Sequence, residues 1–222
     1  MIDKIVGSVR EAVAGVTDGM TVLIGGFTDV GAPFQLLDAL YETGAKNLTV
    51  VANGAGAGER GLAVLVRQGR VRKIICSFPT GSVAARDAIA RGDLELEVTP
   101  QGTMTERLRA AGAGLGGVLT PTGLGTELGQ GKPVYELDGK AYLVERPIHA
   151  DFALIRAWKA DRWGNLAYRY AHRNFNPVMA MAASCTVAQV DELVDDRGLA
   201  PMEADTPGIF VHRVVRVDRG AA

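Results

Sequence analysis

The segment MTVLIGGFTDVGAP, residues 20–33, decides the fold. Its first five residues are apolar or β-branched, which is typical of a short buried strand. Three glycines follow, at Gly25, Gly26 and Gly31, and Pro33 favours the first turn of a helix. The segment therefore predicts a strand, a glycine-lined loop and a helix in direct succession.

The same unit recurs along the first half of the chain. Short apolar runs predict strands at residues 47–52, 72–77 and 94–99. Turns and helical patterns follow them, with helices expected at residues 59–68, 82–91 and 103–111. The last helix would open with a capping box at residues 103–106, leaving Gln101 in a tight turn. Strands that alternate with helices predict an α/β fold with an open, mostly parallel sheet and flanking helices.

The two ends of the chain carry other patterns. Apolar spacing at residues 2–13 predicts an opening amphipathic helix. The glycine- and threonine-rich segment 112–131 is a long irregular loop, which we expect beside a functional site. After it, a hairpin turning at Asp138-Gly139 and strands at 152–157, 166–169 and 209–217 predict a β-rich C-terminal part. No linker or internal repeat is visible, so we predict one domain, residues 1–222.

Charge and hydropathy exclude several classes of partner. Lys and Arg (24) nearly balance Asp and Glu (25), so no basic field is available for a nucleic acid or an anionic membrane. Charged residues interrupt the apolar N-terminus, and no run reaches the roughly 18 apolar residues of a membrane span. We therefore expect a cytoplasmic protein whose partners are small molecules or other proteins.

Motifs for metals, nucleotides and nucleophiles are weak or missing. Cys76 and Cys185 form no CxxC pair, and the three histidines stand far apart, so no metal is indicated. Residues 56–61 fit GxGxxG, but no acidic residue follows between 62 and 85, which disfavours a dinucleotide-dependent oxidoreductase. No GxSxG elbow is present, so the chain shows no nucleophile of its own.

Several segments together resemble the first subunit of the family I coenzyme A transferases, which exchange CoA between an acyl-CoA and a carboxylate. They cover nearly the whole chain: residues 18–33, 76–79, 100–103, 120–123, 150–155, 173–177 and 206–208. Within this family, residues 159–166 are most similar to the A subunits of 3-oxoadipate enzymes, with acetoacetate enzymes close behind.

The resemblance implies an enzyme that is completed by a second chain. In two-chain members the nucleophile is a glutamate in a Ser-Glu-Asn-Gly motif of the B subunit, and this sequence contains no such motif. We therefore expect a B-subunit partner, with two copies of each chain, an acyl-CoA such as succinyl-CoA and a 3-oxoacid as substrates, and no cofactor. The 3-oxoacid that the resemblance favours is 3-oxoadipate. The alternatives are the A subunit of an acetoacetate CoA-transferase and a non-catalytic module of the same fold that binds acyl ligands or sugar phosphates.

The candidate site gathers where parallel strands end, because ligands bind outside the carboxyl edge of such a sheet. Main-chain N–H groups at glycine can approach a developing oxyanion closely, and a glutamine amide can donate without titrating. The predicted substrate- and oxyanion-binding residues are Gly25, Gly26, Phe27, Gly31, Gln101 and Gly102. The alternatives are strand–helix packing for the glycines, turn formation for Gln101 and a core position for Phe27, which we favour for that residue.

Three arginines and two glutamates are further candidates for substrate binding or for helix starts. A dicarboxylic substrate would need a cation for its distal carboxylate, for which Arg60, Arg107 and Arg169 are candidates. Glu59 and Glu106 lie where helices are predicted to begin, so we assign them to helix starts and not to catalysis.

Overall fold

The computed structural model describes residues 2–195 and 198–218. An eight-stranded sheet runs through it in the order β11-β10-β8-β1-β2-β3-β4, with β9 (Leu166–Ala167) paired to β8. All neighbours along this path are parallel, and only β9 is antiparallel. The strands are β1 Thr21–Ile24, β2 Leu48–Gly54, β3 Val71–Phe78, β4 Glu95–Val98, β8 Ala150–Ala160, β10 Ala183–Leu193 and β11 Arg213–Arg216. The predicted open, mostly parallel sheet is confirmed.

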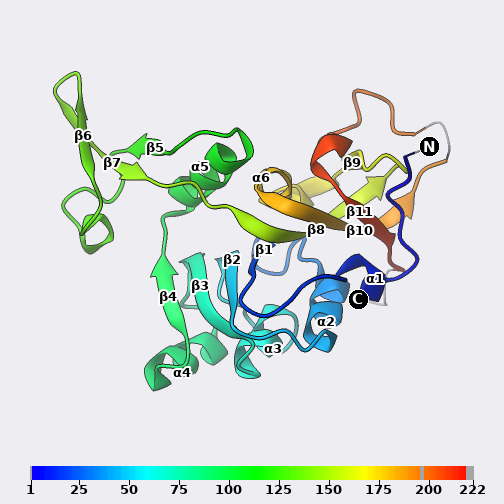
Figure 1. Ribbon diagram of the computed structural model, residues 1–222, viewed down its shortest axis with the longest axis horizontal. Helices are drawn as coiled ribbons and strands as arrows, with labels where there is room; N and C mark the ends of the chain where they lie inside the picture. Colours follow the sequence, from blue (N-terminus) through cyan, green and yellow to red (C-terminus); the bar gives the residue numbers. More distant parts are fainter. Residues whose placement is uncertain (1, 196–197, 219–222) are drawn as a thin grey trace.

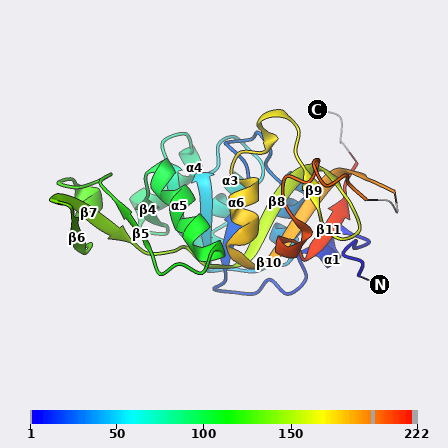
Figure 2. The ribbon, with the colours of Figure 1, turned by 90° about the horizontal axis from the view of Figure 1, so that it is seen from above.

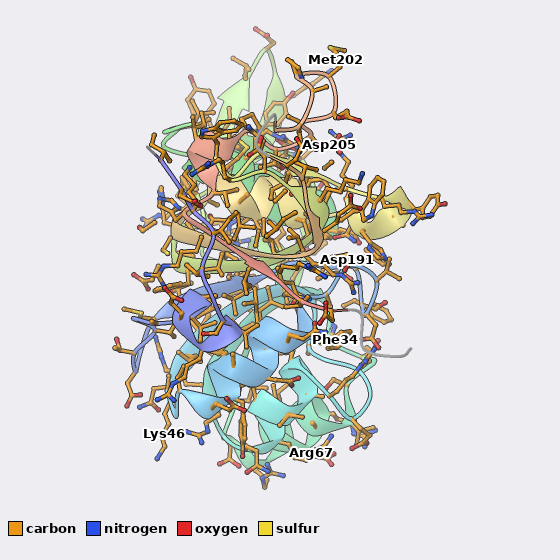
Figure 3. The ribbon with its side chains drawn as sticks, turned by 90° about the vertical axis from the view of Figure 1, so that its right-hand side faces the viewer. Phe34, Lys46, Arg67, Asp191, Met202 and Asp205 are labelled. Carbon is orange, nitrogen blue, oxygen red and sulfur yellow. The ribbon has the colours of Figure 1, made fainter. Side chains whose placement is uncertain are left out.

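Helices cover both faces of this sheet (Figure 1). One face packs against α1 (Val9–Ala12), α2 (Phe34–Glu42), α3 (Leu62–Arg67) and α4 (Val83–Arg91). The other packs against α5 (Gln101–Gly112) and α6 (Asn176–Met181). Figure 3 shows side chains filling the space on both sides of the strands. Successive residues of β1 alternate between the two cores: Val22 and Ile24 belong to the core with α1–α4, and Leu23 belongs to the core with α5 and α6.

The strand order reverses at β1. From there, β2, β3 and β4 extend the sheet in one direction, and β8, β10 and β11 extend it in the other. In an open α/β sheet such a reversal leaves a crevice at the carboxyl ends of the two strands that flank it. The Gly25 loop leaves β1 at this point.

The predicted N-terminal helix is mostly wrong. Only Val9–Ala12 is helical, because Ser8 caps it by accepting a hydrogen bond from the Glu11 N–H at 3.1 Å. The preceding residues extend along the outer strand instead, where the Val6 N–H bonds to the Val214 carbonyl oxygen at 2.8 Å. The main chain of residues 4–6 therefore pairs with the outer edge of β11, a contact that helical periodicity does not reveal.

Two helix starts are also shifted. α3 begins at Leu62 and not at Glu59, because Gly61 has φ 60° and ψ −126°, a conformation outside the helical region. α5 begins at Gln101, with Pro100 as its N-cap, and the predicted capping box at 103–106 does not form. Gln101 is therefore the first residue of a helix and does not lie in a separate turn.

The C-terminal part differs most from the expectation. α6 and the eleven-residue strand β10 were not predicted, and residues 209–217 divide between a 3-10 helix, η3 (Gly208–Phe210), and β11. β10 lies between β8 and β11, and its middle residues, 186–190, are buried. Its sequence, ASCTVAQVDEL, mixes apolar residues with polar and charged ones and contains no continuous apolar run that would predict a strand.

A small antiparallel sheet projects from the main body as an arm (Figures 1 and 2). It has the order β5-β7-β6, with β5 Val118–Thr120, β6 Val134–Leu137 and β7 Lys140–Glu145. The predicted hairpin is confirmed, and its turn residues Asp138 and Gly139 both have positive φ, 51° and 72°. Segment 112–131 runs from the end of α5 through β5 and a short 3-10 helix, η1 (Glu127–Gly129). Most of this segment therefore belongs to the arm. No helix of residues 2–195 and 198–218 is long and apolar enough to cross a membrane.

Candidate active site

Two hollows lie at the carboxyl edge of the sheet, one on each side of the Gly25 loop. The first is lined by residues of three predicted loops, including Gly25, Gly26, Asn53, Gly56, Phe78 and Gly81. The second contains Phe27 and Gln101, together with Thr105, Arg109, Arg173 and Phe175. The loops after β1, β2 and β3 therefore meet as predicted, whereas Gln101 lies in the other hollow beside Phe27. No residue of 112–131 lines either hollow.

Gly25 and Gly26 differ in the use of their main-chain N–H groups. The Gly25 N–H donates to the Leu154 carbonyl oxygen at 2.9 Å and so continues the pairing of β1 with β8. The Gly26 N–H donates to no acceptor in residues 2–195 and 198–218. Gly26 has φ 114°, and a Cβ there would lie 3.0 Å from the main chain of Ala32. Of the two predicted donors, only the Gly26 amide remains available to a ligand.

Residues 27–30 form a tight turn at the tip of the loop. The Phe27 N–H donates to the Val30 carbonyl oxygen at 2.9 Å, and the Val30 N–H donates to the Phe27 carbonyl oxygen at 3.1 Å. Phe27 is 44% exposed, so the favoured core assignment for this side chain is wrong. Gly31 closes the loop against His172, whose carbonyl oxygen would lie 2.9 Å from a Cβ at position 31.

Gln101 stands at the first turn of α5. Its main-chain oxygen accepts a hydrogen bond from the Thr105 hydroxyl at 3.0 Å. Its carboxamide is exposed and bonds to none of the residues that the structure describes. A Cβ at Gly102 would meet nothing within 4 Å, which leaves open space beside Gln101.

The three candidate arginines have different surroundings. Arg60 lies in the first hollow and stacks on Phe34, with its guanidinium carbon 3.7 Å from the ring centroid. Arg169 packs on the rings of Trp158 and Tyr170. Arg107 is almost fully buried and makes its hydrogen bonds at the base of the arm. Arg60 alone among the three lines a hollow at the Gly25 loop.

Two arginines in the second hollow were not predicted from the sequence. Arg173 pairs with Asp205 at 2.9 Å, and Arg109 pairs with Glu106 at 3.1 Å. Both line the same hollow as Gln101 and Phe27. Arg109 lies about two turns after Gln101 in α5, on the same side of the helix. For Arg173 the only available signal was its place at the start of segment 173–177, one of the segments that resemble the family.

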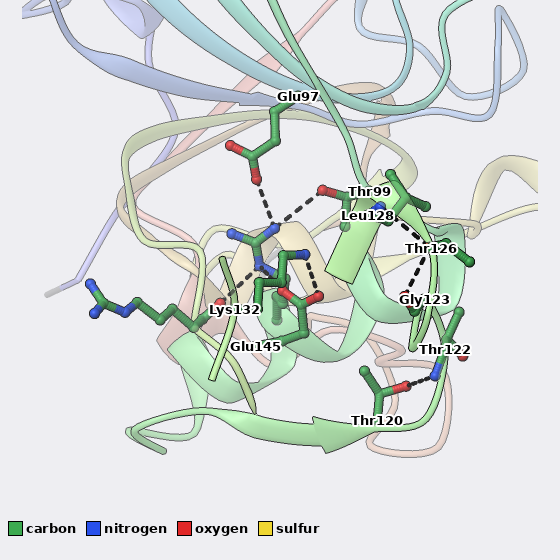
Figure 4. Close-up of polar contacts among 11 residues, drawn as sticks. Glu97, Thr99, Thr120, Thr122, Gly123, Thr126, Leu128, Lys132 and Glu145 are labelled. Atoms are coloured by element: carbon green, nitrogen blue, oxygen red, sulfur yellow. Dashed lines mark hydrogen bonds and ion pairs between the residues drawn. The ribbon is translucent and has the colours of Figure 1, made fainter. Parts of the chain in front are cut away.

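Arg107 joins α5 to β4 and to the segment that follows the arm. Figure 4 shows its partners Glu97 and Thr99, with Lys132 and Glu145 beside them. Its guanidinium donates to Glu97 Oε1 at 2.9 Å, to the Thr99 hydroxyl at 3.2 Å and to the Arg146 carbonyl oxygen at 2.8 Å. Lys132 completes the cluster with a 2.6 Å contact to Glu145. Burial alone would raise the pKa of Glu97, but hydrogen bonds from Lys73 and Arg107 lower it overall. This cluster joins the arm to the main body, and Arg107 lines neither hollow.

The remaining reactive side chains have structural surroundings. Burial raises the pKa of the Cys76 thiol to about 11, which keeps it protonated and weakly nucleophilic. His212 Nδ1 accepts a hydrogen bond from the Thr186 N–H at 3.0 Å. Glu59 pairs with Arg67 at 2.8 Å, ahead of the helix it was predicted to start. Within residues 2–195 and 198–218, no group of three or more His, Cys, Asp or Glu residues could hold a metal ion.

These features define an α/β chain with a ligand crevice where the strand order reverses. The chain belongs to the coenzyme A transferase family, whose family model matches residues 6–217.

Relatives of known function match along the whole chain. It is 52% identical over 224 residues to the A subunit of the 3-oxoadipate CoA-transferase of Pseudomonas putida, covering 100% of this chain and 97% of the relative. It is 53% identical to the protein of the same name from Acinetobacter baylyi, covering 98% of this chain and 96% of the relative. A solved acyl-CoA transferase from E. coli O157:H7 shares the fold, with a TM-score of 0.84 and 24% identity. That match covers 100% of this chain and 48% of the solved chain.

Proposed function

We propose that this chain is the A subunit of a CoA-transferase that moves CoA from succinyl-CoA to 3-oxoadipate. The observation that carries the proposal is the match, above half identity over nearly full length, to two proteins named for 3-oxoadipate. The partner is a B subunit that supplies the nucleophilic glutamate, and two copies of each chain assemble. CoA enters as a substrate thioester, and no further cofactor is required.

The proposed reaction is nucleophilic catalysis by the partner's glutamate carboxylate. The carboxylate attacks the thioester carbonyl, the CoA thiolate leaves, and an acyl-glutamate anhydride forms. The thiolate then attacks the glutamyl carbonyl, which releases succinate and leaves a glutamyl-CoA thioester. The carboxylate of 3-oxoadipate repeats these two steps in reverse, so that the glutamate is regenerated and CoA leaves on the new acid. Each attack places negative charge on a carbonyl oxygen.

This chain contributes the groups that receive that charge. The Gly26 N–H and the Gln101 carboxamide have no partner among the described residues, so each can donate to a substrate oxygen in the hollow that it lines. Oxyanion donors fixed in advance are worth about 3 kcal/mol each in the transition state. Phe27 supplies an apolar wall beside Gln101, and Arg109 and Arg173 add positive charge to the same hollow, which suits a dicarboxylic acid.

Reconstitution with the partner tests the proposed function. The purified chain is mixed with the B subunit encoded beside it, and CoA transfer from succinyl-CoA to 3-oxoadipate is followed. We expect turnover only when both chains are present, with 3-oxoadipate preferred to acetoacetate. A rate no higher with both chains than with neither would reject the transferase proposal, and a preference for acetoacetate would reject only the assigned acceptor.

Gln101→Ala separates a catalytic chain from a non-catalytic acyl- or sugar-phosphate-binding module. If Gln101 stabilises the oxyanion, the variant loses about 100-fold in kcat while it still assembles with the B subunit. Gln130→Ala, the same change at an exposed glutamine of the arm, is the matched control and keeps wild-type turnover. Unchanged turnover in Gln101→Ala would remove this residue from the mechanism.

A further inference from the structure

Asn176 lies beside the Gly25 loop without lining either hollow. It is the first residue of α6 and is fully buried, with 0% of its surface exposed. Its Oδ1 accepts a hydrogen bond from the Arg156 N–H of β8 at 3.1 Å. Its Nδ2 donates to the carbonyl oxygens of His172, at 2.7 Å, and Gly31, at 3.2 Å. One side chain therefore joins β8, the turn before α6 and the end of the Gly25 loop.

The Asn176 carboxamide replaces a main-chain acceptor at the point where β1 leaves the sheet. The β1–β8 register ends at Ile24 opposite Leu154, and the Gly25 N–H makes the last bond. In a continuing parallel ladder the Arg156 N–H would bond to the next carbonyl of β1. Here it bonds to Asn176 Oδ1 instead, so the side chain satisfies a strand donor and the loop is free to turn away.

Asn174 holds the other side of the same loop. Its Nδ2 donates to the carbonyl oxygens of Val30 at 2.9 Å and Ala171 at 2.7 Å. Its Oδ1 accepts from the Phe175 N–H at 2.6 Å, which orients the amide. We refer to Asn174 and Asn176 together as the asparagine clamp.

The clamp explains why position 25 is glycine and contributes at position 31. A Cβ at Gly25 would overlap Asn176 Oδ1, and it would also lie 3.4 Å from the Cα of Ile155. A Cβ at Gly31, where φ is 73°, would lie 2.9 Å from the His172 carbonyl oxygen and 3.1 Å from Asn174 Nδ2. The substrate-facing role therefore falls to the residues between these two glycines.

We propose that Asn174 and Asn176 are positioning residues that set the Gly25–Gly31 loop in its catalytic shape. The inference rests on the proposed function, because the clamp acts through the Gly26 N–H and Phe27. Phe175, which lies between the two clamp residues, lines the hollow that contains Phe27 and Gln101. The clamp therefore fixes the Gly25–Gly31 loop relative to this side of the hollow. Asparagine suits this task because one neutral amide both accepts from a strand N–H and donates to loop carbonyls.

The main test compares Asn176→Ala and Asn174→Ala with Asn165→Ala in the complex with the B subunit. Asn165 is a matched control, since its amide also joins separate segments, accepting from the Gly208 N–H at 2.8 Å and donating to Asp161 at 2.7 Å. We expect kcat of both clamp variants to fall at least tenfold, towards the roughly 100-fold loss that a 1 Å misplacement can cause, with KM changed less than about threefold. Asn165→Ala should lose stability but keep its kcat.

Hydrogen exchange provides a readout that does not require turnover. The Phe27 and Val30 amides are hydrogen-bonded within the loop, so loss of the clamp should speed their exchange, while Asn165→Ala leaves it unchanged. Faster exchange with wild-type kcat would overturn the positioning role. If the wild-type pair transfers no CoA, the proposed function fails by itself, and unchanged loop exchange in the clamp variants would then overturn the clamp as well.

Asn174→Ala keeps the test decisive if Asn176→Ala does not fold. Asn174 is only half-buried, so its truncation should cost less stability than truncation of the fully buried Asn176. Asn174→Asp is the conservative variant, because it retains the acceptor for the Phe175 N–H but loses both donors. We expect it to resemble Asn174→Ala in kcat, and wild-type kcat in Asn174→Asp would show that the bond to Val30 is not needed.

Discussion

The Gly25–Gly31 loop and segment 112–131 of the arm are both rich in glycine, yet their glycines serve different needs. In the loop, a Cβ at Gly25 or Gly31 would run into the asparagine clamp. In segment 112–131, a Cβ at Gly114, Gly116, Gly125 or Gly131 would meet nothing within 4 Å, whereas one at Gly112, Gly117 or Gly129 would lie within 3.0 Å of the main chain of Met181, Glu145 or Gly123. Glycine therefore marks contact with the asparagine clamp in the loop, and a mixture of open surface and main-chain contact in the arm. Only the loop lines the two hollows, so packing separates the two regions.

The largest effect should come from adding a methyl group where the loop is crowded. Gly25→Ala places a Cβ against Asn176 Oδ1, and the adjacent strand leaves little room for either to move. Overpacking of this kind costs about 3 kcal/mol of the free energy of unfolding. Denaturant unfolding measures it, and Asn176→Ala in the same chain should cost less than the sum of the two single changes because the contact is relieved.

Gly116→Ala is the control for this comparison. Its added Cβ meets no atom within 4 Å, and its φ is not positive, so the free energy of unfolding should stay within about 0.5 kcal/mol of the wild type. Equal losses in Gly25→Ala and Gly116→Ala would remove the distinction between the two regions.

The second prediction concerns the base of the arm. Arg107→Met leaves Glu97 and the buried Glu145 with lysine partners only, and breaking a buried ion cluster is strongly destabilising. We expect a loss of about 2 kcal/mol, because Lys73 and Lys132 still compensate part of the charge. Arg91→Met breaks an exposed pair with Asp93 and should change stability by less than about 0.5 kcal/mol. A loss in Arg107→Met no larger than this control would show that the arm is not held by the cluster.

The difference between the regions also shows what the sequence can reveal. Strand–loop–helix order and the period of apolar residues predicted β1 to β4, α4 and the hairpin, because those elements depend on local patterns. β10 was missed because polar residues, among them Thr186 and Gln189, interrupt its apolar positions. α6 was missed because its six residues are too few to show a helical period. The N-terminal residues 2–6 were misassigned because their partner, β11, lies at the other end of the chain.

The candidate site was predictable only in part, for a similar reason. Gly26 and Gln101 follow strand ends, so the carboxyl-edge rule places them correctly in general terms. That rule does not reveal that the Gly25 N–H donates to the Leu154 carbonyl oxygen, or that Asn176 fills the space beside Gly25. Both facts depend on contacts between residues more than a hundred positions apart, which no local pattern contains.

The third prediction concerns the pH dependence of stability at the base of the arm, where Glu97 lies. The pKa of Glu97 lies below its ordinary value of 4.5, so the folded state binds fewer protons than the unfolded state near that pH. The stabilisation is therefore complete above about pH 4.5 and is lost as the pH falls through the lower, folded pKa. Glu97→Gln should flatten this part of the pH dependence of unfolding, measured by urea between pH 6 and about pH 3.5. An unchanged slope would show that Glu97 does not couple acid to the arm.

The smallest effect is expected on the surface of the arm itself. Tyr135 in β6 is 53% exposed and pairs with Tyr142 across the hairpin, so Tyr135→Ser removes one cross-strand contact and little buried area. The free energy of unfolding should fall by no more than about 0.5 kcal/mol in urea titrations of the isolated chain. A loss above about 1 kcal/mol would mean that β6 is packed as tightly as the loop. The contrast between a clamped loop and a loosely supported arm would then have to be abandoned.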